Sequence, residues 1–316
     1  MTVGLLTEFQ AAVLYLLPGA VVLLRISTEK GAMAQAVMWI PAAIAIDLLA
    51  CLVASWVVPL GVAFLVSRLV WLTLGVELLR RRRWRVERPT ADQVRQIGIV
   101  VAAGFAAFAL SATISRPASI WDRQFHIPLV SMMRGQRLPF LTVFQPNTVL
   151  HFHFAGDVMA AGLQVFSFGR LHASLALALA HDLAFGLVGA AMAAWLTTIA
   201  PRRLWIVPAV LAIFLSGPFA LQRTGLGPLV VGYSYLNLLC MSYRPAVAVA
   251  ILFLVGAFGA VGLRLSSPED VPWRRALVVM LSCLAAAGIS DEPSAALWGV
   301  GLAALWLVQP NVLHAR

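Results

Sequence analysis

Charged residues are scarce in this chain. Only 11% of its 316 residues are charged, 61% are hydrophobic, and Lys30 is the single lysine. Water-soluble domains carry roughly a quarter charged residues and about half apolar ones. This composition excludes an ordinary water-soluble domain.

Uncharged apolar runs of about twenty residues recur from one end of the chain to the other. About twenty such residues form a helix that crosses the hydrocarbon layer, and the runs lack the alternation of barrel strands. We therefore expect an all-α transmembrane bundle of about nine spans. One long apolar stretch is divided at Ser55–Pro59 into the second and third spans, because proline breaks helices. The nine expected spans are Leu5–Leu24, Ala36–Trp56, Leu60–Leu79, Ile97–Ile114, Ala173–Ile199, Leu204–Leu221, Ala246–Leu263, Ala276–Ser290 and Ala295–Val308.

Cysteine is rare, and the basic residues are unevenly placed. Cys51, Cys240 and Cys283 lie in apolar runs without metal-ligand spacing, which favours packing roles. The net charge of +10 lies mostly in loops between spans, so it indicates membrane orientation and not a nucleic-acid partner.

The loop from Arg80 to Gln96 carries seven arginines and should face the cytoplasm. This orientation places the N-terminus outside and Arg316 inside. We divide the chain into residues 1–96, with three helices and this basic loop, and a core of residues 97–316 with an outer loop at 115–171. Residues 227–241 are apolar but short, so we expect an interfacial or re-entrant segment there.

The outer loop holds most of the polar residues that chemistry requires. Asp122 and His126 are four residues apart and would share a helix face, where a carboxylate can accept a proton from a hydroxyl. The alternative is an ion pair that fixes a short helix in the membrane interface. Apolar and aromatic residues around these positions favour short interfacial helices in this loop.

His151 and His153 are two residues apart, and Asp157 follows four residues later. Imidazoles near a carboxylate are typical of metal sites, but the same groups bind sugars or phosphates through hydrogen bonds. Both alternatives stay open.

Arginines occur on the outer side, where the charge bias should exclude them. Arg123, Arg134 and Arg137 lie in the first outer loop and Arg223 in the second. Guanidinium groups bind phosphate with two parallel hydrogen bonds, although anionic lipid headgroups are an alternative ligand. Within the spans, Asp47 and the pair His181–Asp182 either hold helices together or join a proton path.

The order of these motifs is similar to that of the GT-C superfamily, membrane glycosyltransferases that use polyprenyl-phosphate sugars. The chain reads WDRQFH, then MMRGQRLPF, then QPNTVLHFHFAGDVMAAGLQVFSFG, then a long helix. The family pattern is an acidic residue after a span, a "G..P" turn, and a second helix opening with aromatic residues or histidines. Asp122, Gly135 with Pro139, and His151–His153 match it. The resemblance extends to lipid A aminoarabinose transferases, lipopolysaccharide core transferases and protein O-mannosyltransferases.

The resemblance implies transfer of a sugar from a polyprenyl phosphate to a hydroxyl on an acceptor glycan, lipid or protein, usually with inversion. Asp122 is then the base and His126 its partner. The groups around the donor are Arg123, Arg134, Arg137, His151, His153, Asp157 and Arg223. No metal ligand is assigned and no cofactor is firmly implied, while a divalent cation stays an alternative. The expected location is the plasma (inner) membrane, with the active face extracytoplasmic or periplasmic.

Two other classes of function remain. A transporter or flippase for an anionic lipid would need polar residues along the spans. A non-catalytic scaffold in cell-envelope glycan assembly would tolerate the loss of Asp122 and His153 together. The chain differs from the family in having three spans before the motif and few after it. A partner membrane protein is therefore an alternative requirement for activity, beside the membrane lipids.

Overall fold

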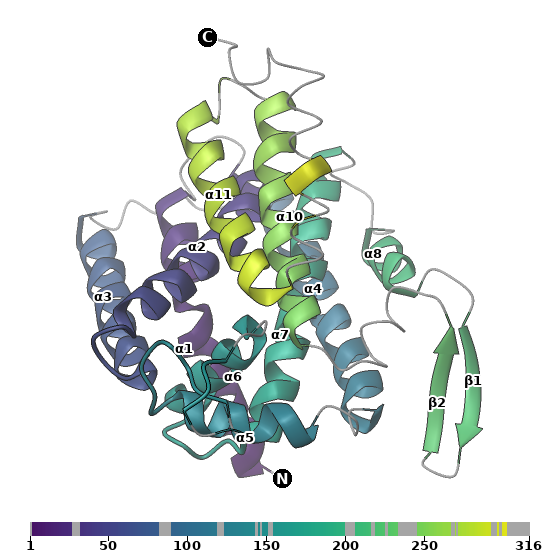
Figure 1. Cartoon of the computed structure of the whole chain (residues 1–316). Helices are drawn as coiled ribbons and strands as arrows, with labels where there is room; N and C mark the ends of the chain where they lie inside the picture. Colours follow the sequence, from purple (N-terminus) through teal and green to yellow (C-terminus); the bar gives the residue numbers. More distant parts are fainter. Residues whose placement is uncertain are drawn as a thin grey trace.

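The computed structural model describes most of the chain. The described residues are 2–26, 32–81, 90–118, 123–142, 145, 147–150, 154–199, 206–215, 219–224, 227–232, 245–266, 269, 271–291, 296 and 299–301. They form a helical bundle with one short β-hairpin (Figure 1).

The first four helices are α1 (Thr2–Ile26), α2 (Ala32–Ala54), α3 (Leu60–Arg81) and α4 (Ala91–Ala118). Two shorter helices follow, α5 (Arg123–Met133) and α6 (Ala155–Phe166), and then α7 (Ala173–Ile199) and α8 (Ile206–Leu215). Strands β1 (Phe219–Thr224) and β2 (Gly227–Gly232) pair in antiparallel fashion before α10 (Pro245–Ser266) and α11 (Trp273–Ser290).

Six of the described helices are long and apolar enough to cross a membrane. They are Gly4–Arg25, Leu60–Arg81, Ala91–Thr113, Ala173–Thr197, Val247–Leu265 and Trp273–Ser290. A shorter apolar helix, Met38–Ala54, accompanies them. These helices indicate a multi-pass membrane protein, as the composition predicts.

Three of the nine expected spans differ from these six. Ala36–Trp56 corresponds to α2, which ends at Ala54 in a turn before Pro59, so the expected break between the second and third spans is confirmed. Ala295–Val308 lies almost wholly outside the described residues. The expected span Leu204–Leu221 is wrong at its end, because α8 ends at Leu215 and Phe219 begins β1. The Gly217–Pro218 dipeptide disfavours continuation of a helix, and the facing strand β2 supplies the backbone partners instead.

The structure describes the first part of residues 227–241. Gly227–Gly232 is strand β2 of the hairpin, and its expected interfacial or re-entrant placement stays a prediction. The remaining residues of that segment lie outside the described part of the chain.

The long helices fix two ends of the bundle. Helices α4 and α7 run antiparallel, since Gly104 lies against Ala190 while Ser111 contacts Asp182. Helices α10 and α11 form an antiparallel hairpin, and the carbonyl of Ile289 at the end of α11 accepts the N–H of Phe154 just before α6. Both α7 and α10 therefore begin at the end of the bundle that carries α5 and α6, the lower end in Figure 1. The segment that joins them returns from one end to the other and includes α8.

Helix α6 is short, as expected for the first outer loop, but it packs inside the protein, which the sequence does not predict. Every residue from Ala155 to Gln164 is buried, and so is Phe166. Small residues allow this position, because they let neighbouring helices approach closely. The Phe64 ring of α3 lies only 3.0–3.2 Å from where a Cβ at Gly162 would stand. Helix α5 is amphipathic by comparison, with Leu129 and Met133 buried and Met132 exposed.

One continuous hydrophobic cluster joins both halves of the chain. It includes Tyr15 and Leu48 from the first three helices as well as Phe166 and Phe253 from the later ones. The N-terminal helices therefore pack as part of the core, so residues 1–96 and 97–316 are divisions of the sequence that share one packed body.

We expect the α4–α7 contact to be sensitive to single methyl groups. A Cβ at Gly189 would lie 2.6 Å from the Cβ of Ala107, so Gly189→Ala should destabilise the protein by about 1–3 kcal/mol through overpacking. Unfolding of the detergent-purified protein in a denaturant series measures this. Gly98→Ala on α4 is the matched control, because no atom lies within 4 Å of its added Cβ. Equal behaviour of the two variants would contradict the close α4–α7 contact.

Candidate functional site

A buried histidine–aspartate pair joins the two short helices of the expected outer loop. His126 Nδ1 lies 2.8 Å and 3.0 Å from the two carboxylate oxygens of Asp157. Both side chains are almost fully buried, with 8% and 2% of their surface exposed. His126 lies in the first turn of α5 and Asp157 in the first turn of α6, so the pair holds the two N-terminal turns together.

This geometry fixes the histidine's hydrogen-bonding role. An ionised carboxylate only accepts hydrogen bonds, so Nδ1 of His126 carries the hydrogen that Asp157 receives. In the neutral ring, Nε2 then holds the lone pair and can accept a proton. A carboxylate that orients an imidazole in this way is a common support for general acid–base chemistry. The start of α6 also favours the negative charge of Asp157 through the helix dipole.

Several expected site residues lie outside the described residues. These are Asp122, His151 and His153, and nothing is described of the side chains of Arg123 and Arg223. By covalent connection, Asp122 immediately precedes the first residue of α5, and His153 precedes Phe154 at the start of α6.

The start of α6 is well anchored. The N–H of Phe154 donates to Ile289 O at 3.1 Å, and its ring packs edge-on against Phe140 with centroids 5.4 Å apart. The positions to which Asp122 and the histidine motif attach are therefore held near each other by α5, α6 and α11.

Two expected donor ligands lie at the other end of α5. Arg134 and Arg137 follow the last turn of this helix, and both are exposed. Eight residues separate Arg134 from His126, which is about 12 Å along a helix. Of the expected residues, the structure thus brings His126 and Asp157 together but places Arg134 and Arg137 apart from them. Arg223 belongs to β1, where it pairs with Pro228.

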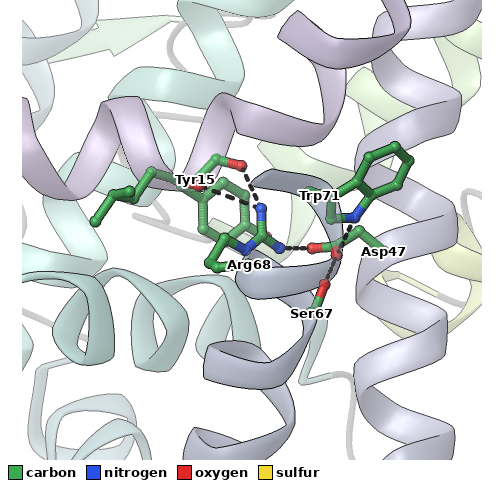
Figure 2. A network of polar contacts seen from close by, with 6 residues as sticks. Tyr15, Asp47, Ser67, Arg68 and Trp71 are labelled. Carbon is green, nitrogen blue, oxygen red and sulfur yellow. Dashed lines mark hydrogen bonds and ion pairs between the residues drawn. The ribbon is translucent and has the colours of Figure 1, made fainter. Parts of the chain in front are cut away.

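A second buried polar network lies inside the bundle, between α1, α2, α3 and α6. Asp47 on α2 accepts hydrogen bonds from Ser67, Arg68 and Trp71 on α3, and the Trp71 bond measures 2.9 Å (Figure 2). Asp47 and Arg68 form an ion pair in which each side chain is only 4% exposed. Ionisable groups are costly inside a membrane protein, and such mutual pairing lowers that cost.

Arg68 also links α3 to two further helices. Its Nη1 donates to the carbonyl oxygens of Leu14 and Tyr15 on α1, at 3.2 Å and 3.4 Å. Its guanidinium carbon lies 4.9 Å from the centroid of the Phe166 ring at the end of α6. Gln10 of α1 adds a hydrogen bond to the carbonyl of Phe166 at 3.0 Å. The network therefore connects the N-terminal helices to α6.

Sequence reasoning named Asp47 but missed Arg68, although a signal was present. Arg68 interrupts an apolar run that is otherwise uncharged until Glu77. Asp47 lies seven residues before the end of α2 and Arg68 eight residues after the start of α3. In an antiparallel helix hairpin, residues about equally far from the turn lie at about the same depth in the membrane. The ion pair between Asp47 and Arg68 could therefore have been predicted from the sequence.

A third polar cluster is buried between α4 and α7. Ser111 Oγ donates to Asp182 Oδ1 at 2.7 Å and lies 3.1 Å from His181 Nδ1. Because the hydroxyl hydrogen goes to the carboxylate, the Ser111 oxygen accepts a hydrogen bond from His181 Nδ1. All three side chains are fully buried. This geometry supports the helix-joining alternative for His181 and Asp182.

The metal alternative has no support among the described residues, which contain no group of three His, Cys, Asp or Glu side chains able to hold an ion. The two histidines that suggested it, His151 and His153, lie outside that part of the chain. A metal at the histidine motif stays a hypothesis.

We expect the Asp47–Arg68 pair to show strong coupling. Arg68→Leu leaves a buried carboxylate without its cation and should destabilise the protein by about 3–5 kcal/mol. Asp47→Leu combined with Arg68→Leu should cost less than the two single changes summed, because no charge is then left buried. Chemical unfolding in micelles measures all three variants.

The control is Arg81→Leu at the exposed pair with Glu77, which should change stability by no more than about 0.5 kcal/mol. Additive effects of the Asp47 and Arg68 changes would show that the two side chains act independently.

Comparisons with known proteins add no relative. No protein-family model matches this chain, and neither a curated protein nor a solved structure matches it. What the protein does must therefore be inferred from its own sequence and geometry.

Proposed function

We propose that this protein is a membrane glycosyltransferase that moves a sugar from a polyprenyl phosphate to an acceptor hydroxyl at the α5–α6 end of the bundle. The observation that carries the proposal is the His126–Asp157 pair. This pair joins the first turns of the two helices to which Asp122 and the His151–His153 motif are attached. A multi-pass bundle with acid–base groups at one end suits a donor whose tail stays in the bilayer.

In the proposed reaction, Asp122 accepts the proton of the acceptor hydroxyl as its oxygen attacks the anomeric carbon. The new bond forms as the bond from that carbon to the phosphate oxygen breaks, and the electron pair leaves with the polyprenyl phosphate. Attack from the face opposite the leaving group inverts the anomeric configuration. Arg123, His151 and His153 stabilise the charge that the phosphate gains.

His126 is a positioning residue in this scheme. Asp157 fixes the orientation of the His126 ring through Nδ1, so Nε2 of the neutral ring acts as a hydrogen-bond acceptor. Asp157 is therefore assigned to His126 and not to the donor, which is a more specific role than the sequence indicates.

The buried charges favour a transferase over a transporter. Asp47 and Arg68 bind each other, and Asp182 accepts from Ser111. Charges that hold neighbouring helices together in this way stabilise the bundle, whereas a transport path needs groups that exchange partners as the substrate moves.

Asp122→Asn should reduce sugar transfer by about three orders of magnitude or more, because an amide cannot accept the hydroxyl proton at neutral pH. The assay follows release of undecaprenyl phosphate from a panel of undecaprenyl-phosphate hexoses and pentoses with membranes that hold the protein. Glu77→Gln is the control, because Glu77 is a partly exposed residue near the opposite end of α3. Full activity of Asp122→Asn would remove the proposed base.

Asp157→Asn should lower kcat by about a hundredfold or more and leave the donor KM nearly unchanged, because the carboxylate orients His126 without binding the donor. Steady-state kinetics across donor concentrations separate the two parameters. A raised KM with unchanged kcat would instead assign Asp157 to the donor, as the sequence resemblance implies.

The proposed active face is extracytoplasmic, in the plasma membrane. A cysteine at Arg137 should react with a membrane-impermeant maleimide added to intact cells, and a cysteine at Arg81 should react only after the cells are broken. The three native cysteines are replaced by alanine in both variants. The reverse labelling pattern would place the α5–α6 end in the cytoplasm, away from the expected donor face.

A further inference from the structure

Three loops meet where α5 and α6 end and α3 begins, and they form an exposed surface that the proposed reaction does not use. We call it the arginine–aromatic corner. Its exposed members are Trp56, Val57, Arg134, Arg137, Phe168 and Arg170.

Backbone hydrogen bonds hold the first two loops together. The N–H of Gly61 donates to Arg134 O at 2.8 Å, and the N–H of Leu138 donates to Ser55 O at 2.9 Å. The carbonyl groups of the loop after α5 thus satisfy the N-terminal N–H groups of α3, which otherwise have no partner within their helix. This contact places Arg134 and Arg137 next to the turn that carries Trp56.

The third loop follows α6. Gly169 there has a φ of +75°, a conformation that favours glycine, and its N–H donates to Gln164 O at 2.9 Å. Nη1 of Arg134 lies 3.5 Å from where a Cβ at Gly169 would stand. The Arg134 guanidinium therefore lies over this loop at Gly169, which is the residue before Arg170 in the sequence.

The charge of the corner is uncompensated within the described part of the chain. Arg134, Arg137 and Arg170 form no ion pair with any described residue, whereas Arg80 and Arg81 at the opposite end both contact Glu77. The partial negative charges at the C-terminal ends of α5 and α6 favour cations there and reduce their mutual repulsion. The corner nevertheless presents three guanidinium groups that suit an anion.

Large apolar side chains stand beside these cations. Trp56 is 62% exposed, and Val57 and Phe168 are each 71% exposed. Trp56 and Val57 form the turn between α2 and α3, directly before a helix of spanning length begins at Leu60. The corner thus lies at the depth of the bilayer surface, where aromatic rings and arginines meet lipid headgroups.

We propose that the arginine–aromatic corner binds the phosphate headgroup of an anionic phospholipid of the surrounding bilayer. The three guanidinium groups contact the phosphate, while Trp56, Val57 and Phe168 contact the glycerol and upper acyl region. This site is separate from the reaction centre, because Arg134 lies at the far end of α5 from His126. It stands whether or not the protein transfers sugar.

The test uses the full-length protein in an uncharged detergent and compares dioleoyl phosphatidylglycerol with dioleoyl phosphatidylcholine by native mass spectrometry. Wild type should retain phosphatidylglycerol preferentially. The triple variant R134Q/R137Q/R170Q should bind it about a hundredfold more weakly, since each arginine near a membrane surface contributes about 1 kcal/mol. Phosphatidylcholine binding should be the same for both proteins.

Two controls decide the interpretation. R80Q/R81Q/R274Q removes the same charge at the opposite end and should keep the phosphatidylglycerol preference. An equal loss in both triple variants would show a response to net charge alone and overturn the proposal. Inorganic phosphate at the same concentration as phosphatidylglycerol should not displace the lipid, and it should not raise the thermal unfolding midpoint of the protein. Displacement of the lipid by phosphate would assign the corner to free phosphate. The Asp122→Asn variant should bind phosphatidylglycerol as well as the wild type does. A loss of sugar transfer in this variant therefore leaves the lipid-binding proposal intact.

Discussion

The ion pair between Asp47 and Arg68 is the interaction on which the arrangement of this bundle depends. In a hydrocarbon environment neither charge is tolerated alone, so α2 and α3 must keep the register that brings the two together. The same arginine binds two carbonyl groups of α1 and stacks on Phe166 of α6. One pair of charges thus determines how four helices meet, and the position of α6 follows from it.

Helix α6 in turn determines the candidate site. Its C-terminal end is held by Arg68 and Gln10, and its N-terminal end by the backbone of α11. Asp157 is therefore fixed deep in the protein, and His126 must come to it, which seats α5 against the bundle. The three N-terminal helices thus support α6 and, through it, the candidate site.

Composition was sufficient to predict the class of protein and most helices, because apolar length alone decides what can cross a bilayer. The break at Pro59 followed from the conformational limits of proline. What the sequence could not reveal depended on contacts between distant segments. The burial of α6 required knowledge that Phe64 fills the space beside Gly162, and the hairpin that replaces the end of the expected span at Leu221 required the pairing of Phe219 with Gly232. No local sequence pattern predicts the pairing of His126 with Asp157, because the two residues are 31 positions apart.

The two ends of α5 explain why polar residues that are close in sequence serve different purposes. The N-terminal turn of α5 is joined to α6 by the buried imidazole of His126 and the carboxylate of Asp157. Burial excludes water from this pair, and the carboxylate fixes the tautomer of the ring. The C-terminal end carries exposed guanidinium groups beside Trp56 and Phe168, the surface that we propose binds a phospholipid headgroup. The lipid-linked donor of the proposed reaction would approach such a site from within the bilayer. A headgroup bound at one end of α5, as we propose, would hold the protein at a constant depth in the bilayer. The His126–Asp157 pair at the other end of α5 would then keep a constant depth as well, which the proposed reaction with a lipid-linked phosphate requires.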